Sequence, residues 1–224
     1  MVPEFLPLET KSMPDLSLYV DSLYTSPFAM PVYVALSEMG LDFELETVDI
    51  ERGEQHRSPF REQSGTGRIP ALRHGDFWLS ESSAICEYLH DEFAAASILI
   101  YPAGVRERAR ARQVQAWLRS DLAALRQDRP TDIIFRAEKR AAMTDAGRKA
   151  ADKLLSFAAT LIGDRETLFA EWCIADTELA LMLNRLVMNG DPVPETLTRY
   201  AGQEWQRPSI QAWCALARGE AQAP

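Results

Sequence analysis

The sequence contains few cysteines: three in 224 residues, namely Cys86, Cys173 and Cys214. Their number is odd and no two are spaced as Cys-x-x-Cys, which argues against both a disulfide framework and a zinc site. Because free cysteine is among the most buried residue types, we expect three buried thiols in a reducing compartment and no bound metal.

Long apolar runs and an excess of basic residues are also lacking. No apolar run approaches the roughly 20 residues of a membrane span, and no basic start is followed by the apolar core of a signal peptide. Lysine and arginine total 24 against 33 acidic residues, a net charge of -9, so the chain lacks the positive surface that binds phosphate backbones or anionic lipid. These features predict a cytoplasmic protein with neither nucleic acid nor a membrane as partner.

The first 93 residues predict an α/β domain. Apolar positions there alternate between the period of two of a strand and the longer period of a helix. A helix between two strands implies a parallel pair and a tight hairpin an antiparallel one, so the order βαβαββα predicts a mixed four-stranded sheet. The expected elements are strand Leu16–Asp21, a helix closed by Gly40, strand Phe43–Asp49, a short helix or loop near 54–63, strands Pro70–His74 and Phe77–Leu79 joined by Gly75-Asp76, and a helix from its cap Ser80 to Leu89.

Beyond residue 93 the pattern is helical and contains no strand candidate. The expected helices are Val105–Gln127, Thr144–Ile162, Ile174–Met188 and Ile210–Ala217. The chain therefore divides into a tail (1–14), an α/β domain (15–93), a linker (94–104) and an all-α domain (105–220).

Three short motifs in the α/β domain combine polar groups with a helix or strand start. Ser26-Pro27-Phe28 is usually an N-cap followed by proline at the first helical position. The same geometry presents a hydroxyl to an anion held at the helix N-terminus. Tyr24 and Thr25 are rival hydroxyls, whereas a tyrosine within the first strand, at position 19, is expected in the core.

The other two motifs begin the third strand and the helix after the hairpin. In Arg68-Ile69-Pro70 a cis bond before Pro70 would turn the backbone of Ile69 toward a peptide-like ligand, which pairs with it as an added strand. In Glu81-Ser82 the simple interpretation is a helix start. The alternative is a site for an amino acid head group, with Ser82 and backbone N–H groups on the carboxylate and Glu81 on the ammonium.

Together these motifs resemble the glutathione transferase superfamily. The resemblance lies in the βαβαββα order with Ser-Pro, then Arg-Ile-Pro, then Glu-Ser eleven residues after Pro70. The helical half continues it: in CIADTELAL, Asp176 looks like the family's buried capping residue, although Cys173 replaces the usual Ser or Thr. The stretches ARQVQAWLRSDL, RPTDIIF and FAEWCIADTELALMLNRLV resemble a bacterial YfcF-type glutathione transferase.

The resemblance implies a thioredoxin-like domain followed by a helical bundle, glutathione as co-substrate and no metal. Ser26 would stabilise the glutathione thiolate, which attacks small electrophiles and, as a sibling activity, organic peroxides, in detoxification and oxidative stress. Omega-like classes carry a cysteine where this chain has Ser26, so thiol exchange through this residue is not expected. Ile69-Pro70 would pair with the cysteinyl unit, Glu81 and Ser82 would hold the γ-glutamyl end, and Arg68 would lie near the glycyl carboxylate.

A second-substrate pocket is expected between the domains, lined by Tyr24, Phe28, Trp117 and Asp121. Asp121 lies on an apolar row seven residues after Val114, and a buried carboxylate there needs a partner, either Arg112 or a residue of the α/β domain. His56 has two interpretations: it assists at the glutathione site, or it is a solvated histidine on the surface.

Three functions remain open at this point. The leading hypothesis is transfer of glutathione to small electrophiles. The second is isomerisation of a maleyl-type acid, which would need an anion-binding second pocket. The third is a non-catalytic member of the fold that binds a protein partner. The resemblance also implies a homodimer. Its expected patches are the hairpin at Phe77 and Trp78 and the first long helix, where arginines would meet carboxylates of a second copy: Arg106, Arg108, Arg110 and Arg112 with Glu87, Asp91 and Glu92. The alternative is that these arginines form a solvated helix face.

Overall fold

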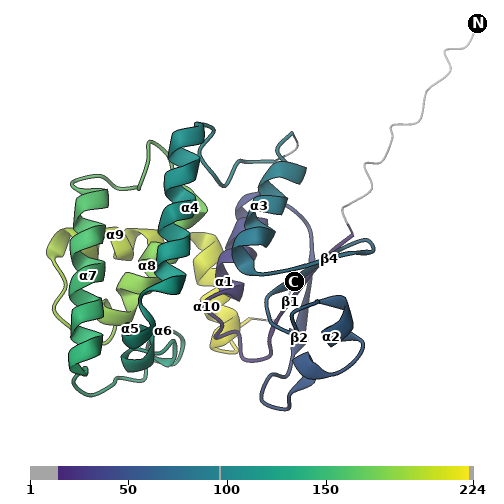
Figure 1. Cartoon of the computed structure of the whole chain (residues 1–224), viewed down its shortest axis with the longest axis horizontal. Coiled ribbons are helices and arrows are strands. Elements are labelled where there is room, and N and C mark those ends of the chain that lie inside the picture. Colours follow the sequence, from purple (N-terminus) through teal and green to yellow (C-terminus); the bar gives the residue numbers. More distant parts are fainter. Residues whose placement is uncertain (1–14, 96, 222–224) are drawn as a thin grey trace, which may run out of the picture.

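A computed structural model describes residues 15–95 and 97–221 (Figure 1), and the predicted tail lies outside the described residues. Its four strands form one sheet in the order β2-β1-β3-β4. β1 runs parallel to β2 and antiparallel to β3, and β3 pairs antiparallel with β4. The predicted mixed sheet is therefore confirmed, and its strands are β1 (Leu16–Asp21), β2 (Glu44–Val48), β3 (Ala71–His74) and β4 (Phe77–Ser80).

Helices flank this sheet as the alternation of side chains requires. Leu18 and Val20 of β1 point to one face and are fully buried, and α1 and α3 contact the strands. Tyr19 points to the opposite face, where its ring packs against Phe60 of α2 and Trp78 of β4. The helical elements of this part are α1 (Ala29–Glu38), η1 (Glu54–His56), α2 (Phe60–Gln63) and α3 (Ser82–Glu92).

The ends of these helices confirm one local prediction and correct another. Gly40 has φ +65, so it closes α1 in the left-handed conformation that glycine adopts without cost. The prediction that Ser80 caps the next helix is wrong: Ser80 belongs to β4, and its Oγ accepts a hydrogen bond from the Thr66 hydroxyl at 3.0 Å. α3 begins two residues later, after Glu81.

The rest of the chain is helical and packs around α8, whose residues 174–186 are all buried. Figure 1 shows α4 between α8 and α3, with α7 on the side away from the sheet. α10 returns to α1, where the fully buried Trp213 contacts the rings of Tyr24 and Tyr33. The helices are α4 (Val105–Ser120), α5 (Ala123–Asp128), α6 (Asp132–Phe135), α7 (Asp145–Ile162), α8 (Ile174–Val187), α9 (Glu195–Trp205) and α10 (Pro208–Ala217).

The predicted single helix Val105–Gln127 is wrong, because the chain breaks into α4 and α5 at Asp121-Leu122. The guanidinium of Arg126 donates to the carbonyl oxygens of Leu118 and Arg119, at 2.8 and 2.9 Å. These last carbonyls of α4 thus receive side-chain partners in place of a continued helix. α9 was not predicted; Gly202 within it weakens the helical pattern.

Asp176 caps the N-terminus of α8 as predicted. Its Oδ2 accepts from the backbone N–H of Cys173 at 2.9 Å, and its Oδ1 accepts from the Leu168 N–H at 2.7 Å and the Tyr200 hydroxyl at 2.8 Å. The carboxylate is fully buried, and burial raises its pKa while these hydrogen bonds oppose the rise. One side chain therefore joins α8 to α9 and to the segment before α8.

The three cysteines are free and buried, as predicted. Within the described residues, none of the helices combines the length and apolar character of a membrane span, and no cluster of three or more acidic, histidine or cysteine side chains is suited to a metal ion. Arg112 of α4 pairs with Glu87 of α3 at 2.8 Å within the same chain. The expected contact of these two residues between two copies is thus replaced by an internal one.

Candidate functional site

Residues of all three predicted motifs line one cavity of about 160 Å³. Arg68-Ile69-Pro70 leads into β3, and Glu81-Ser82 stands at the start of α3. One residue before α1 and one residue of α4 complete the lining. The lining comprises Arg68, Ile69, Pro70, Glu81 and Ser82, with Phe28 of the first motif and Arg119 of α4.

The polar groups of this cavity are available to a ligand. The Ile69–Pro70 peptide bond is cis, and no hydrogen bond between described residues uses the N–H or C=O of Ile69. Ser82 is buried at the N-terminus of α3, where the first N–H groups have no partner inside the helix. Glu81 is exposed and has φ +72, a conformation that costs energy for a non-glycine residue and is concentrated at functional sites.

Ser26 lies beside the cavity rather than in its lining. Its Oγ accepts from the backbone N–H groups of Ala29 at 3.2 Å and Phe28 at 3.4 Å, at the start of α1. A hydroxyl has one proton to donate, and among the described residues the Ser26 proton has no acceptor. The side chain is therefore fixed by two accepted bonds and retains its donor.

Asp21 orients this loop and was missed by the sequence analysis. It ends β1, is 1% exposed, and accepts from the Thr25 N–H, the Thr25 hydroxyl and the Ser26 N–H at 2.8, 3.0 and 3.0 Å. The usable signal was a carboxylate at the end of a buried strand, just before a loop with hydroxyl residues. The Thr25 hydroxyl is occupied by Asp21, whereas the Ser26 hydroxyl is not.

Arg119 and Glu178 were also missed, and they connect the helical part to the cavity. One guanidinium nitrogen of Arg119 donates to Glu178 at 2.8 Å and to the Ser82 hydroxyl at 3.1 Å. Gln115 donates to the same Glu178 oxygen at 2.6 Å and accepts from the Tyr101 hydroxyl. Burial raises the pKa of Glu178, and Arg119 and Gln115 oppose the rise. The signal was Gln115 and Arg119 on the apolar row that begins at Ala111.

A second, narrower cavity of about 20 Å³ adjoins the first and shares Phe28 and Arg119 with it. One wall comes from the start of α1 and the others from the helical part. Its lining comprises Pro27, Phe28, Leu118, Arg119, Arg126, Glu178, Leu181, Met182 and Arg185. Of the four residues expected in a second-substrate pocket, only Phe28 lines it.

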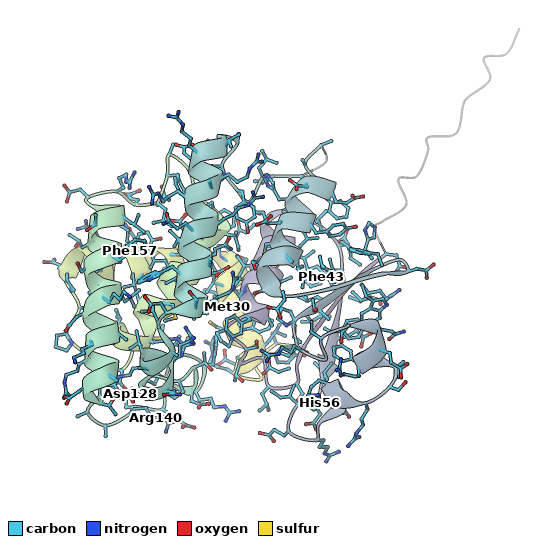
Figure 2. All side chains as sticks on the ribbon, viewed as in Figure 1. Met30, Phe43, His56, Asp128, Arg140 and Phe157 are labelled. Carbon is cyan, nitrogen blue, oxygen red and sulfur yellow. The ribbon has the colours of Figure 1, made fainter. Side chains whose placement is uncertain are left out.

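The remaining expected residues lie elsewhere. Trp117 packs on Phe157 of α7 with ring centroids 4.3 Å apart, and its Nε1 donates to Asp121, which also pairs with Lys153. Figure 2 shows Phe157 on the outer helix α7, so this pair faces away from the cavities. Asp121 is exposed rather than buried, and its partner is Lys153, not the expected arginine.

Tyr24 and His56 also stand apart from the cavity lining. Tyr24 contacts Trp213 edge to face, and burial, aided by Asp21, raises the pKa of its phenol. His56 is exposed in η1, at the lower edge of the sheet-bearing part in Figure 2. Its ring contacts only its neighbour Gln55 among the described polar groups.

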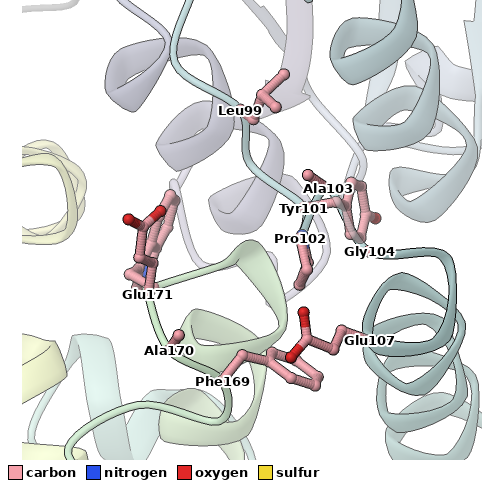
Figure 3. A pocket seen from close by; sticks show the side chains of 10 residues that line it. Leu99, Tyr101, Pro102, Ala103, Gly104, Glu107, Phe169, Ala170 and Glu171 are labelled. Carbon is pink, nitrogen blue, oxygen red and sulfur yellow. The ribbon is translucent and has the colours of Figure 1, made fainter.

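A further cavity of about 190 Å³ contains none of the predicted site residues. Figure 3 shows the segment from Leu99 to Gly104 facing Glu107 and the stretch from Phe169 to Glu171. Its two charged side chains, Glu107 and Glu171, are both acidic, which disfavours a ligand that carries a carboxylate.

Known proteins resemble both halves of the chain. The family model "Glutathione S-transferase, N-terminal domain" matches residues 25–92, and "Glutathione S-transferase, C-terminal domain" matches residues 104–219. Glutathione S-transferase Z2 of Arabidopsis thaliana is 29% identical over 207 residues, 88% of this chain and 89% of that protein. Glutathione S-transferase theta-3 of Mus musculus is 35% identical over 102 residues, 46% of this chain but only 41% of that protein.

A solved structure agrees with the fold. The crystal structure of a glutathione transferase homolog from Burkholderia, with bound glutathione, is 44% identical, with a TM-score of 0.75 over 92% of this chain and 100% of that one. The thioredoxin-like sheet followed by a helical domain is thereby established. The finer resemblance to YfcF-type proteins stays a prediction.

Proposed function

The chain belongs to the glutathione S-transferase family, and we propose that it binds glutathione in the 160 Å³ cavity and transfers it to small electrophiles. One observation carries the proposal: residues of two motifs eleven positions apart converge on a single cavity beside the start of α1. The Burkholderia structure, similar over nearly the whole chain, contains glutathione, which supports the same ligand here.

Each polar group of the cavity has a matching part in glutathione. The free N–H and C=O of Ile69 pair with the cysteinyl unit in the manner of an added strand. The α3 N-terminus and Ser82 receive the γ-glutamyl carboxylate, while Glu81 receives the ammonium group and Arg68 the glycyl carboxylate. Arg119, already bonded to Ser82, adds positive charge beside the γ-glutamyl carboxylate.

Ser26 donates its hydroxyl proton to the sulfur of glutathione and so stabilises the thiolate. A free thiol has a pKa of about 8.5, and lowering it by about two units requires about 2.7 kcal/mol. The thiolate then attacks an electrophilic carbon, forming a C–S bond as the leaving group departs with its electron pair. With a peroxide it takes one oxygen and releases an alcohol, and a second glutathione then yields the disulfide and water.

Ser26→Ala is expected to lower kcat/KM about ten- to a hundredfold at pH 6.5, because one hydrogen bond to a charged group contributes roughly 1.5–3 kcal/mol. The deficit should shrink at pH 9, where thiolate forms without help. Steady-state conjugation assays across this pH range measure the effect.

The matched control is Thr25→Val, which removes the neighbouring hydroxyl already committed to Asp21. It should change the pH profile less than Ser26→Ala does. Full activity of Ser26→Ala at pH 6.5 would reject the serine assignment and make Tyr24 the next candidate. A thermal shift with glutathione, measured in parallel, separates lost chemistry from lost binding.

A second candidate is glutathione-dependent isomerisation of a maleyl-type acid. The basic lining of the 20 Å³ cavity, with Arg119, Arg126 and Arg185, favours it, because such a substrate carries carboxylates. The third candidate, a partner-binding protein without glutathione, has no comparable support, since the polar groups of the larger cavity suit a small peptide.

We propose a homodimer as the working unit. Phe77 at the β4 hairpin is 48% exposed although it packs on Tyr88. Ile98 and Val105, in the segment between α3 and α4 and at the start of α4, are 67% and 73% exposed. Large exposed apolar side chains of this kind mark interaction surfaces when they gather on one face. A two-fold interface repeats one patch on both subunits.

Light scattering at micromolar concentration and 0.15 M salt is expected to give about twice the 25.2 kDa of one chain. Phe77→Glu should shift the mass toward one chain, since it places a charge in the apolar contact. The control is Ile50→Glu, at an apolar residue after β2 that is 40% exposed and is not part of the β4 hairpin or of α4. A wild-type mass near 25.2 kDa with full activity at the same concentration refutes the dimer.

A further inference from the structure

Two arginines of the 20 Å³ cavity carry charges without a carboxylate partner among the described residues. Arg185 of α8 is buried, and one terminal nitrogen donates to the Arg129 carbonyl oxygen at 2.6 Å. Its Nε is also buried and has no hydrogen-bond partner. Arg126 of α5 donates only to the carbonyl oxygens that end α4. Both guanidinium groups therefore donate to neutral carbonyl oxygens, and neither forms an ion pair among the described residues.

The charge balance of the cavity is positive. Arg119, Arg126 and Arg185 face a single carboxylate, that of Glu178, which is engaged by Arg119. Burial, followed by repulsion from Arg126, lowers the pKa of Arg185 to about 10, so it remains charged at neutral pH. A buried charge is costly unless an opposite charge compensates it, and this cavity supplies none for the buried Arg185 or the half-buried Arg126.

We propose that this cavity binds a carboxylate of the second substrate, a specificity that rests on the glutathione-transfer function proposed above. About 20 Å³ is room for one small polar group. Because the cavity shares Phe28 and Arg119 with the larger one, the rest of such a substrate extends toward the glutathione sulfur. The substrate class is an electrophile with an apolar body and a terminal carboxylate.

The walls agree with that class. Phe28 closes the cavity from the sheet-bearing part, and Leu118, Leu181 and Met182 supply apolar surface from α4 and α8. An apolar body gains from contact with these side chains, whereas a carboxylate gains charge-assisted hydrogen bonds from the guanidinium groups. Arg126 could instead serve only to hold the carbonyl oxygens that end α4. Such a structural role affects stability, but it gives no preference for a carboxylic acid substrate over its ester.

The test compares ethacrynic acid with its methyl ester. In both, the sulfur adds to the terminal methylene carbon of an enone and the adjacent carbon takes a proton, while the carboxyl group is separated from the enone by an aromatic ring and an ether. Each kcat/KM is divided by the uncatalysed rate constant with glutathione. The acid-to-ester ratio in the wild type is expected to be about ten or more, the value of one charge-assisted hydrogen bond.

Arg185→Met should reduce this ratio to about one, and Arg185→Lys, which keeps the charge, should retain part of it. Arg126→Met, at a half-buried residue, provides a second variant if Arg185→Met does not fold. The matched control is Arg199→Met, which removes an exposed guanidinium of α9 and should leave the ratio unchanged.

A wild-type ratio near one, with the ester turned over, overturns the carboxylate proposal and leaves glutathione transfer intact. A high ratio that survives in both Arg185→Met and Arg126→Met also overturns it. If neither compound is turned over and glutathione produces no thermal shift, the proposed function fails and this inference fails with it.

Discussion

Asp176→Ala is expected to lower the free energy of unfolding by about 3–5 kcal/mol. The Asp176 carboxylate is the acceptor for three donors, the N–H groups of Leu168 and Cys173 and the hydroxyl of Tyr200. Alanine leaves all three without an acceptor in the interior, and each buried donor left unpaired costs about 1–3 kcal/mol. Urea denaturation at fixed protein concentration measures the loss as a lower midpoint with an unchanged slope.

Two further variants separate this mechanism from a general effect of losing an acidic side chain. Asp176→Asn keeps the shape and one acceptor oxygen but points an amide N–H₂ at some of the donors, so an intermediate loss is expected. Asp152→Ala removes an exposed carboxylate of α7 and should stay within about 0.5 kcal/mol of the wild type. A loss below about 1 kcal/mol for Asp176→Ala would contradict the capping role.

The sheet and α1 were predictable because local rules decide them. Leu16–Asp21 was predicted as a buried strand, and the observed β1 has these bounds, with every residue buried except the half-buried Tyr19. Gly40 and the Gly75-Asp76 turn mark chain reversals that need positive φ, and Gly75 has φ +58. In such segments propensity, pattern and tertiary structure agree.

The break between α4 and α5 was not predictable in this way. The apolar row from Val114 to Leu125 continues across it, so periodicity alone favours one helix. What ends α4 is the Arg126 guanidinium on the carbonyls of Leu118 and Arg119, a contact formed after the chain has turned. The orientation of Trp117 and Asp121 was likewise not predictable. The sequence does not show whether this face of α4 is directed toward the sheet or toward α7, and their contacts with Phe157 and Lys153 of α7 decide it.

The candidate site likewise combines residues that local motifs predicted with residues that only the packing of helices brings together. Short motifs predicted most of the residues that now line the larger cavity. Each motif alone has an ordinary role at a helix or strand start, and only their combination, through the resemblance to glutathione transferases, indicated a site. Arg119, Arg126 and Arg185 were not predicted. On a helix, an arginine is usually solvated with its aliphatic stem on the surface, and the sequence does not show that α4, α5 and α8 direct three of them to one cavity.

Arg119→Met is expected to lower the free energy of unfolding by about 3 kcal/mol and to raise the KM for glutathione severalfold. Removing one partner of a buried ion pair leaves the other charge uncompensated, and such changes cost about 3–5 kcal/mol. Here Glu178 is the charge left behind, with a side chain only 8% exposed. The KM effect follows because Arg119 also bonds Ser82 in the proposed γ-glutamyl site.

Arg112→Met is a matched control on the same helix. Arg112 and Glu87 are also 2.8 Å apart, but their side chains are 42% and 37% exposed, against 20% and 8% for Arg119 and Glu178. A surface pair contributes about 0–1 kcal/mol, so the two variants should differ by about 2 kcal/mol or more. Equal losses would show that exposure does not set the contribution of these pairs.

The loss in Arg119→Met should also depend on pH, in a direction that the Glu178 pKa determines. Burial raises that pKa in the folded state, and Arg119 opposes the rise, so removing Arg119 raises it further. The folded variant then binds the Glu178 proton more tightly than the unfolded chain does, and its stability increases as pH falls through the folded pKa toward the ordinary glutamate range.

The stability difference from the wild type should therefore be largest near pH 8 and shrink toward pH 5. Adding Glu178→Gln should abolish this pH dependence, because the titrating group is gone; a stability difference that grows as pH falls would place the uncompensated charge elsewhere.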